Sequence, residues 1–120
     1  MTLYERLGGE AAIQAAVILF YEKVMADPSL SPFFEGVDFE KQIQKQIAFM
    51  TMAFGGPSQY SGRDLRASHA SSVRRGLGDA HFDRVASLLG ETLDELGIPG
   101  PTIDEVLSVV GTTRNDVLGR

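Results

Sequence analysis

The sequence contains no cysteine, and this absence excludes four kinds of chemistry at once. A disulfide framework, a zinc site with thiolate ligands, an iron–sulfur cluster and a cysteine nucleophile all require the thiol group. Histidine is also scarce, since the chain has only His69 and His81. A metal cage built from three histidines is therefore impossible, whereas a metal held by one protein ligand stays open.

Long apolar runs are missing as well. The longest uninterrupted run of apolar residues, Ala15 to Tyr21, has seven members. A membrane-spanning helix needs about 20 such residues, and the apolar core of a signal peptide lies near the start of the chain behind positive charge. We therefore expect a soluble, cytoplasmic protein without a membrane partner.

Basic residues are in the minority. Eleven lysines and arginines stand against sixteen acidic residues, which gives a formal net charge of −5. Because a negative protein repels phosphate backbones, nucleic acid is not an expected partner. Neither the G-x-S-x-G turn of hydrolases nor a G-x-x-x-x-G-K phosphate loop is present. The sequence therefore offers no motif for hydrolase chemistry.

The apolar content predicts a folded protein. Of the 120 residues, 43% are hydrophobic and 22% are charged, which lies outside the composition of disordered chains. A chain of this length fits one ordinary domain, so we expect a single domain over residues 1–120.

Glycine and proline divide the chain into pieces of helical length, and no segment reads as a convincing strand. We expect Asp38 and Asp79 to be N-caps, and Thr102 to Glu105 to form a capping box. The chain is therefore predicted to be all-α, with five or six helices and a poorly ordered stretch before His69. The expected helices cover residues 3–7, 10–27, 39–54, a weak segment around 65–73, 80–96 and a last helix from 103, with a short connector at 29–34.

Apolar residues recur on one face of each expected helix, at spacings of three and four. In the piece 10–27 this face consists of Ile13, Val17, Phe20, Tyr21 and Val24. In the piece 80–96 it consists of Phe82, Val85, Leu89, Leu93 and Leu96. We expect these faces to form the core.

Several polar residues fall on the apolar faces, where each needs a partner. Gln46 lies amid the stripe of residues 39–54, Gln42 lies one turn earlier, and Tyr21 lies within the stripe of residues 10–27. An unpaired buried amide costs about 1–3 kcal/mol, so the glutamines need a backbone group, Tyr21, a water or a ligand. The tyrosine hydroxyl also needs a partner. The pattern alone leaves these alternatives open.

The two histidines differ in their surroundings. His69 lies between Leu65 and Val73 on a narrow apolar face, where an imidazole must donate, accept or coordinate. An isolated histidine of this kind is more often a core residue than a metal ligand. His81 falls beside Asp79 and Asp83, so we expect a solvated side chain paired with a carboxylate and a structural role.

A series of short motifs runs in order along nearly the whole chain. In this order they resemble the group I truncated haemoglobins, specifically the cyanobacterial-like branch. The motifs are Thr2-Leu3-Tyr4-Glu5-Arg6-Leu7-Gly8-Gly9, Phe20-Tyr21, Phe33-Phe34, Gln42-Ile43-Gln44-Lys45-Gln46, Phe54-Gly55-Gly56-Pro57, Tyr60-Ser61-Gly62-Arg63, His69, Gly76-Leu77, His81-Phe82-Asp83 and Asn115-Asp116-Val117-Leu118.

The resemblance implies a two-over-two helical sandwich around haem b, with a loosely structured segment delivering the proximal iron ligand. His69 matches that ligand, and Tyr21 matches the tyrosine on the distal side. Gln42 and Gln46 match the distal amides, and Phe34 matches the aromatic residue that wedges the porphyrin. Phe49, from the same piece as the glutamines, completes the expected haem contacts.

Lys45 occupies a position where some members of this family have a histidine that can ligate iron. An ammonium must lose its proton before its nitrogen can bind iron, so we expect Lys45 to prefer a haem propionate or solvent. Some members also bind a haem vinyl group through a histidine in the last helix, but this chain reads Thr112-Thr113-Arg114 there. We therefore expect non-covalent haem. Lys41, Arg66 and Arg74 are alternative partners for the propionates.

The expected function follows from the resemblance. It implies reversible binding of oxygen, nitric oxide and carbon monoxide at a His69-ligated iron, with Tyr21, Gln46 and Gln42 as hydrogen-bonding groups. A second implied function is nitric oxide dioxygenation with a reductase as partner. The alternative from another class is a cofactor-free helical interaction module, whose inward polar residues satisfy one another. We expect a monomer.

Overall fold

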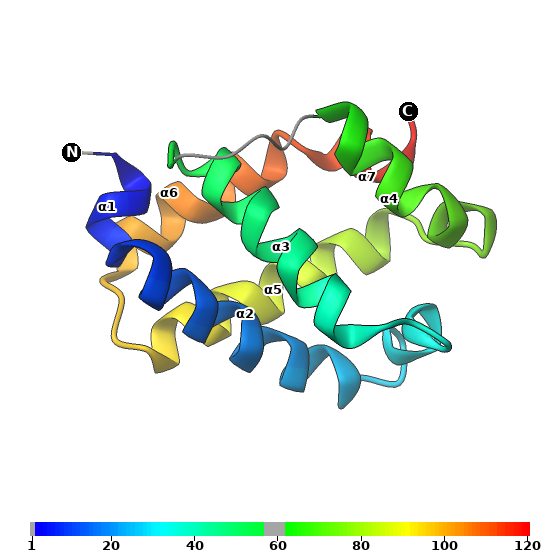
Figure 1. Cartoon of the computed structure of the whole chain (residues 1–120), viewed down its shortest axis with the longest axis horizontal. Coiled ribbons are helices and arrows are strands. Elements are labelled where there is room, and N and C mark those ends of the chain that lie inside the picture. The colour runs from blue at the N-terminus through cyan, green and yellow to red at the C-terminus, as the bar shows by residue number, and fades with distance from the viewer. Residues whose placement is uncertain (1, 57–61) are drawn as a thin grey trace.

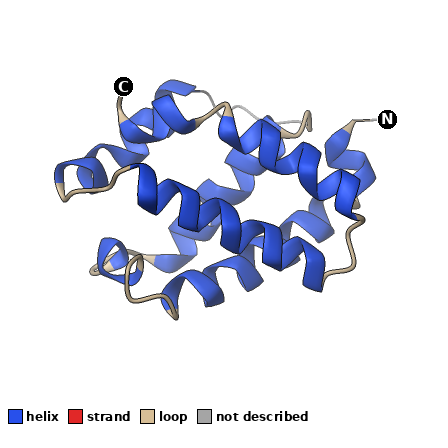
Figure 2. Cartoon of the chain, turned by 180° about the vertical axis from the view of Figure 1, so that it is seen from behind, coloured by secondary structure: helices blue, strands red, loops and turns tan. Residues whose placement is uncertain are grey.

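The computed structural model describes residues 2–56 and 62–120, and every regular element in these two ranges is helical (Figures 1 and 2). The all-α prediction is therefore confirmed. The elements are α1 (Leu3–Leu7), α2 (Gly9–Met25), the 3-10 helix η1 (Ser31–Phe34), α3 (Phe39–Ala53), α4 (Gly62–Arg74), α5 (Asp79–Glu95), α6 (Gly100–Gly111) and α7 (Arg114–Leu118).

Four long helices form two packed pairs. α2 packs against α3, and α5 packs against α6, while α2 also contacts α5 and so joins the two pairs. In Figure 1, α3 crosses in front of α5, and α4 and α7 lie together at the upper right. The two-over-two arrangement predicted from the resemblance is thus present, with α4 and α7 closing one side.

The core consists of the predicted inner faces. All five residues of the α2 stripe are buried, from Val17 at 0% exposure to Tyr21 at 5%. In the stripe of α5, Phe82, Leu89 and Leu93 are buried and Val85 is partly buried, but Leu96 is 43% exposed. Because α5 ends at Glu95, Leu96 is the C-cap residue and has left the buried face.

Helix starts are partly as predicted. Asp38 caps α3 by accepting hydrogen bonds from the backbone N–H groups of Glu40 and Lys41, at 3.1 and 3.3 Å. Asp79, in contrast, is the first residue of α5 rather than its N-cap, which is Gly78. The Asp79 carboxylate is therefore available for contacts with other elements.

The expected capping box at Thr102 does not form. α6 begins at Gly100, with Pro99 as N-cap, so Thr102 and Glu105 lie inside the helix. Pro101 is tolerated in the first turn, where a backbone N–H has no intrahelical partner, and this allows the earlier start. Glu105 instead forms an ion pair with Arg6 of α1.

Two segments are more regular than predicted. The connector 29–34 contains η1, and His69 lies in the interior of α4 rather than in a loosely structured segment. α4 packs along α7, and tertiary packing of this kind stabilises a helix that is weak by its sequence alone. Part of the stretch that we expected to be poorly ordered, residues 58–61, lies outside the described ranges. None of the described helices is both long enough and apolar enough to cross a bilayer.

Candidate functional site

A cavity lies between α2, η1, α3, α4, α5, α6 and α7. The space not filled by protein atoms amounts to about 850 Å³ when the open solvent at the mouth of the cavity is included. The residues that line it are Phe20, Tyr21, Val24, Leu30, Phe33, Phe34, Gln42, Gln46, Phe49, Met50, His69, Ser72, Leu77, Phe82, Val85, Leu89, Val110, Thr113 and Val117.

Most of this lining is apolar or aromatic, with a few polar side chains. The polar ones are Tyr21, Gln42, Gln46, His69, Ser72 and Thr113. Apolar walls with a small number of convergent polar groups are typical of sites for small molecules and cofactors. The arrangement favours a large apolar ligand that has one atom able to bind a nitrogen ligand or to form a hydrogen bond.

Tyr21 and Gln42 are hydrogen-bonded to each other. The Nε2 of Gln42 in α3 donates to the hydroxyl oxygen of Tyr21 in α2, at 3.1 Å. The tyrosine ring meets Phe34 and Phe39 edge-on, with centroids 5.7 and 6.1 Å apart. The ring is thus fixed in the wall by aromatic packing, and its hydroxyl oxygen is bound by the Gln42 amide.

The two helices α3 and α4 bring the remaining predicted polar residues to the same cavity. Gln46 lies one turn after Gln42 in α3, and His69 lies in α4, and both are half-buried residues of the lining. Tyr21, Gln42, Gln46 and His69 therefore share one apolar space, although they come from three helices. Sequence reasoning placed each on an apolar face but could not show that the faces meet.

Phe34 and Phe49, which are expected to contact haem, also belong to the wall of this cavity. Both line the cavity, and Phe34 stacks on Phe39 at 6.0 Å between ring centroids. The neighbouring Phe33 is held by Arg75, which follows α4. The guanidinium of Arg75 lies over the Phe33 ring at 5.9 Å and donates to the carbonyl oxygens of Pro32 and Phe33.

Lys45 is separate from this group. Its side chain is exposed and does not belong to the lining of the cavity. Of the candidate propionate partners, Lys41 and Arg74 are exposed and form no ion pair with a described residue. Arg66 is engaged elsewhere, since it donates to Asp116 Oδ1 at 3.2 Å and to the carbonyl oxygen of Arg120 at 3.0 Å.

His81 was predicted to pair with a carboxylate, and this prediction is wrong. The Nδ1 atom accepts a hydrogen bond from the backbone N–H of Gly78 at 3.0 Å, and the ring meets Phe33 edge-on at 5.0 Å. The expected carboxylates, Asp79 and Asp83, bind arginines of the C-terminal segment instead. The role of His81 in the structure is to cap α5.

Two polar lining residues were not predicted from the sequence. Ser72 follows His69 by three residues and therefore lies on the same helix face, which is a signal that the pattern did contain. Thr113 lies between α6 and α7, where no helical period applies. Its position in the cavity wall follows only from the tertiary packing.

The side chains that could ligate a metal in this cavity fit a metal whose other ligands come from a cofactor. Among the residues that the structure describes, no group of three or more His, Asp or Glu side chains could hold a metal ion. The cavity offers one imidazole, His69, within apolar and aromatic walls. A porphyrin-bound iron needs a single protein ligand of this kind and a dry enclosure, so these residues fit haem.

Comparisons with known proteins agree with this fit. Residues 2–118 match the family model described as bacterial-like globin. A group 1 truncated hemoglobin of Synechocystis is 46% identical over 122 aligned positions, covering 99% of this chain and 98% of the relative. The 2/2 hemoglobin of Synechococcus, solved in the cyanomet state with covalently attached heme, superposes with a TM-score of 0.93 at 49% identity over the full length of both chains. The truncated hemoglobin of Tetrahymena pyriformis, in its Fe(III) form, gives 0.90 at 42% identity, again over both full chains.

Proposed function

From the premise that this chain belongs to the bacterial-like globin family, as a group 1 truncated haemoglobin, we propose that it binds oxygen, nitric oxide and carbon monoxide reversibly. Members of this family carry haem and bind diatomic gases. The cofactor-free interaction module considered for the sequence is therefore set aside. What remains to be assigned is the role of each residue in the cavity.

His69 is the proposed proximal ligand. When bound, haem supplies an iron that takes one nitrogen ligand from the protein and a gas on its other side. His69 is one of two histidines in the chain, and the other, His81, uses its Nδ1 atom to cap α5. His69 is half-buried in the apolar wall of the cavity, and a neutral imidazole is a common metal ligand.

Tyr21, Gln42 and Gln46 are the proposed distal residues. Because the Tyr21 oxygen accepts a hydrogen bond from Gln42, we propose that its O–H group donates toward a gas in the cavity. The amide of Gln46, one turn further along α3, would supply a second donor. Oxygen accepts such hydrogen bonds far better than carbon monoxide, so these groups favour oxygen.

Phe34 and Phe49 would pack against the porphyrin, and we propose that the haem is held without a covalent bond. The Synechococcus relative has covalently attached heme, whereas the only histidines here are His69 in α4 and His81 in α5. Neither lies in the segment 112–114 where the resemblance would require one. We propose that exposed Lys45 contacts a propionate or solvent rather than the iron.

One observation carries this proposal: His69 and the Tyr21–Gln42 pair line the same cavity from different helices. The test is the absorption spectrum of the protein purified with haem present. We expect an intense Soret band, which His69→Ala removes or shifts and the matched control His81→Ala leaves in place. A Soret band unaffected by His69→Ala at full haem content would overturn the assignment of His69.

Nitric oxide dioxygenation is a second candidate that uses the same cavity. One molecule each of nitric oxide and oxygen, with one electron, gives nitrate, so the reaction needs a reductase to return the electron. The two functions differ in turnover. A dioxygenase consumes many equivalents of nitric oxide in the presence of a reductant, whereas a carrier stops after one equivalent.

Three further expectations stay predictions. They are the single domain over residues 1–120, the monomeric state and the cytoplasmic location. Sedimentation of the holoprotein tests the second of them directly.

A further inference from the structure

The helix that carries His69 is held in the fold mainly by the last helix. α4 and α7 share the most extensive contact between any two elements of the described chain. Arg66 of α4 adds a polar contact, since it donates to Asp116 Oδ1 in α7 and to the carbonyl oxygen of Arg120. The position of α4 therefore depends on how firmly α7 is fixed.

α7 cannot fix itself. It has five residues, Arg114–Leu118, whereas isolated helices shorter than about 12–15 residues are marginal in water. Its anchors lie elsewhere in the fold. Leu118 is buried at 6% exposure, and Val117 contributes to the cavity wall. These two apolar side chains are not enough to fix so short a helix. Other contacts must hold its two ends.

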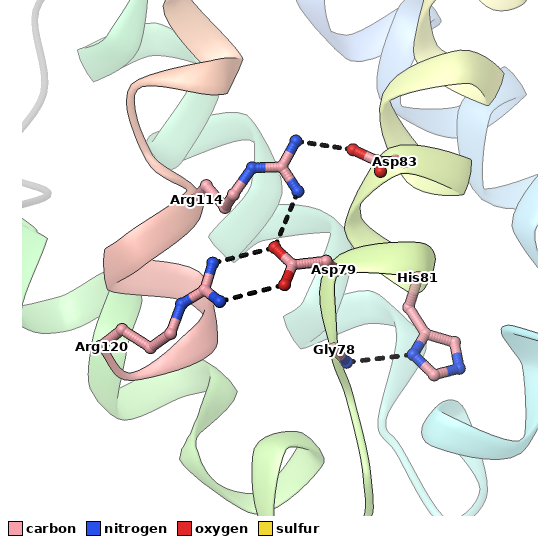
Figure 3. A network of polar contacts seen from close by, with 6 residues as sticks. All are labelled: Gly78, Asp79, His81, Asp83, Arg114 and Arg120. Atoms are coloured by element: carbon pink, nitrogen blue, oxygen red, sulfur yellow. Dashed lines mark hydrogen bonds and ion pairs between the residues drawn. The ribbon is translucent and has the colours of Figure 1, made fainter.

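Those contacts converge on one carboxylate, that of Asp79, the first residue of α5 (Figure 3). Arg120, just beyond α7, makes two parallel hydrogen bonds to it, at 3.0 and 2.9 Å. Arg114, the first residue of α7, donates to Asp79 Oδ1 at 3.0 Å and to Asp83 Oδ1 at 2.6 Å. Asp79 thus binds α7 at both of its ends.

The same network touches the cavity wall. The guanidinium of Arg114 lies 4.5 Å from the centroid of the Phe82 ring, and Phe82 lines the cavity. Thr113, the residue before Arg114, lines it too. Arg114 therefore links the first turn of α7 to Phe82, a residue of the cavity wall.

The geometry sets this network apart from an ordinary surface ion pair. A single exposed ion pair contributes little to stability, but bidentate arginine–carboxylate geometry and a shared network of charges raise the contribution. Asp79 also lies in the first turn of α5, where the helix dipole favours a negative charge. Hydrogen bonds from Arg120 and then Arg114 lower the pKa of the Asp79 carboxyl below its usual value of 3.8.

We infer that Asp79 is a positioning residue for His69: by holding both ends of α7 it fixes α4, and with it the imidazole. The inference rests on the proposed role of His69 as iron ligand. Asp79 touches neither the cavity nor the imidazole, and it acts through Arg114, Arg120 and the α7–α4 contact.

The test uses the haem-loaded protein in its ferrous, gas-free form. Resonance Raman spectroscopy reports the stretching vibration of the bond between His69 and iron, and amide hydrogen exchange reports the opening of α4. We expect Asp79→Asn to shift or broaden the vibration and to speed exchange in α4 about fivefold relative to α2, the factor for about 1 kcal/mol. Asp79→Glu, which keeps the carboxylate, should restore both readouts toward the wild-type values.

Asp27→Asn is the matched control. Asp27 is also an aspartate bound to an arginine, with Oδ2 2.6 Å from Arg84 Nε, but it joins the end of α2 to α5 and touches neither α4 nor α7. It should lower the stability of the fold while leaving the vibration and the α4-to-α2 exchange ratio unchanged. If Asp79→Asn prevents folding, Arg120→Ala removes the bidentate pair without altering α5 and should give the same two changes.

Two results would overturn the inference. One is an unchanged vibration and exchange ratio in Asp79→Asn or Arg120→Ala, and the other is an equal change in Asp27→Asn. Failure of the proposed function looks different, because the vibration would then be missing from the wild-type protein or would persist in His69→Ala.

Discussion

The side-chain amide of Gln42 donates a hydrogen bond to the hydroxyl of Tyr21 at 3.1 Å, across the contact between α3 and α2. Each of these polar groups lies on an otherwise apolar helix face, and the hydrogen bond gives each of them a partner there. The bond leaves the O–H group of Tyr21 as a donor. Substitutions of the two residues, alone and together, can therefore separate their contributions to ligand binding.

Removal of the Tyr21 hydroxyl should shorten the lifetime of bound oxygen. A hydrogen bond to a charged or strongly polarised acceptor contributes about 1.5–3 kcal/mol, which corresponds to about a 10- to 100-fold faster dissociation for Tyr21→Phe. Stopped-flow displacement of oxygen by carbon monoxide measures the rate. The control is Tyr4→Phe, since Tyr4 packs near Gly56 and away from the cavity. Unchanged dissociation in Tyr21→Phe would remove Tyr21 from the distal role.

Gln42 should act on oxygen partly through Tyr21. If the amide orients the hydroxyl, Gln42→Leu speeds oxygen dissociation in the wild-type background but much less in the Tyr21→Phe background. Residues in direct contact commonly show a coupling of about 0.5–3 kcal/mol in such a double-mutant cycle. Additive effects of the two substitutions would mean that each side chain contacts the ligand independently.

Gly8 should be difficult to replace. It ends α1 with φ at +113°, and a Cβ atom there would lie 2.9 Å from the Cβ of Ala12. A strained backbone conformation costs about 1–3 kcal/mol, so Gly8→Ala should lower Tm by several degrees. Gly111→Ala is the comparison, because that glycine has no neighbour within 4 Å and no positive φ. Calorimetry should show it to be neutral or stabilising.

The acid stability of the fold should depend on Asp27. Hydrogen bonds from Ser29 and then from Arg84 lower the pKa of this carboxyl from 3.8 to about 2. A depressed pKa means that the folded state binds the proton less readily than the unfolded state does. The stabilisation is therefore complete above about pH 4 and is lost as the pH falls from 3.8 toward 2. Urea titrations across this range should show a shallower loss of stability in Asp27→Asn.

Much of the fold could be predicted because its signals are local. The α2 stripe repeats within one helix, and Asp38 caps the backbone of residues that follow it directly. The polar candidates could be predicted for the same reason, since Tyr21, Gln42 and Gln46 interrupt apolar faces whose periods are visible in the sequence. Such signals require no knowledge of how the helices pack.

The features that could not be predicted depend on distant parts of the chain. Asp79 is predicted to be an N-cap, but its carboxylate binds Arg114 and Arg120, which lie 35 and 41 positions later in the chain. His81 was expected to pair with a carboxylate, but its ring packs edge-on against Phe33 of the distant η1 while its Nδ1 atom accepts from the backbone of Gly78. Thr113 lies in the cavity wall at a break between two helices. In each case tertiary packing decides among contacts that are locally equivalent.

Arg75 links two parts of the cavity wall. It joins the end of α4, whose His69 lines the cavity, to the backbone of η1, whose Phe33 and Phe34 line it as well. If haem has to separate α4 from η1 when it enters or leaves, the hydrogen bonds of Arg75 to Pro32 and Phe33 oppose that separation. We therefore expect the residence time of the prosthetic group to depend in part on a guanidinium that does not itself line the cavity.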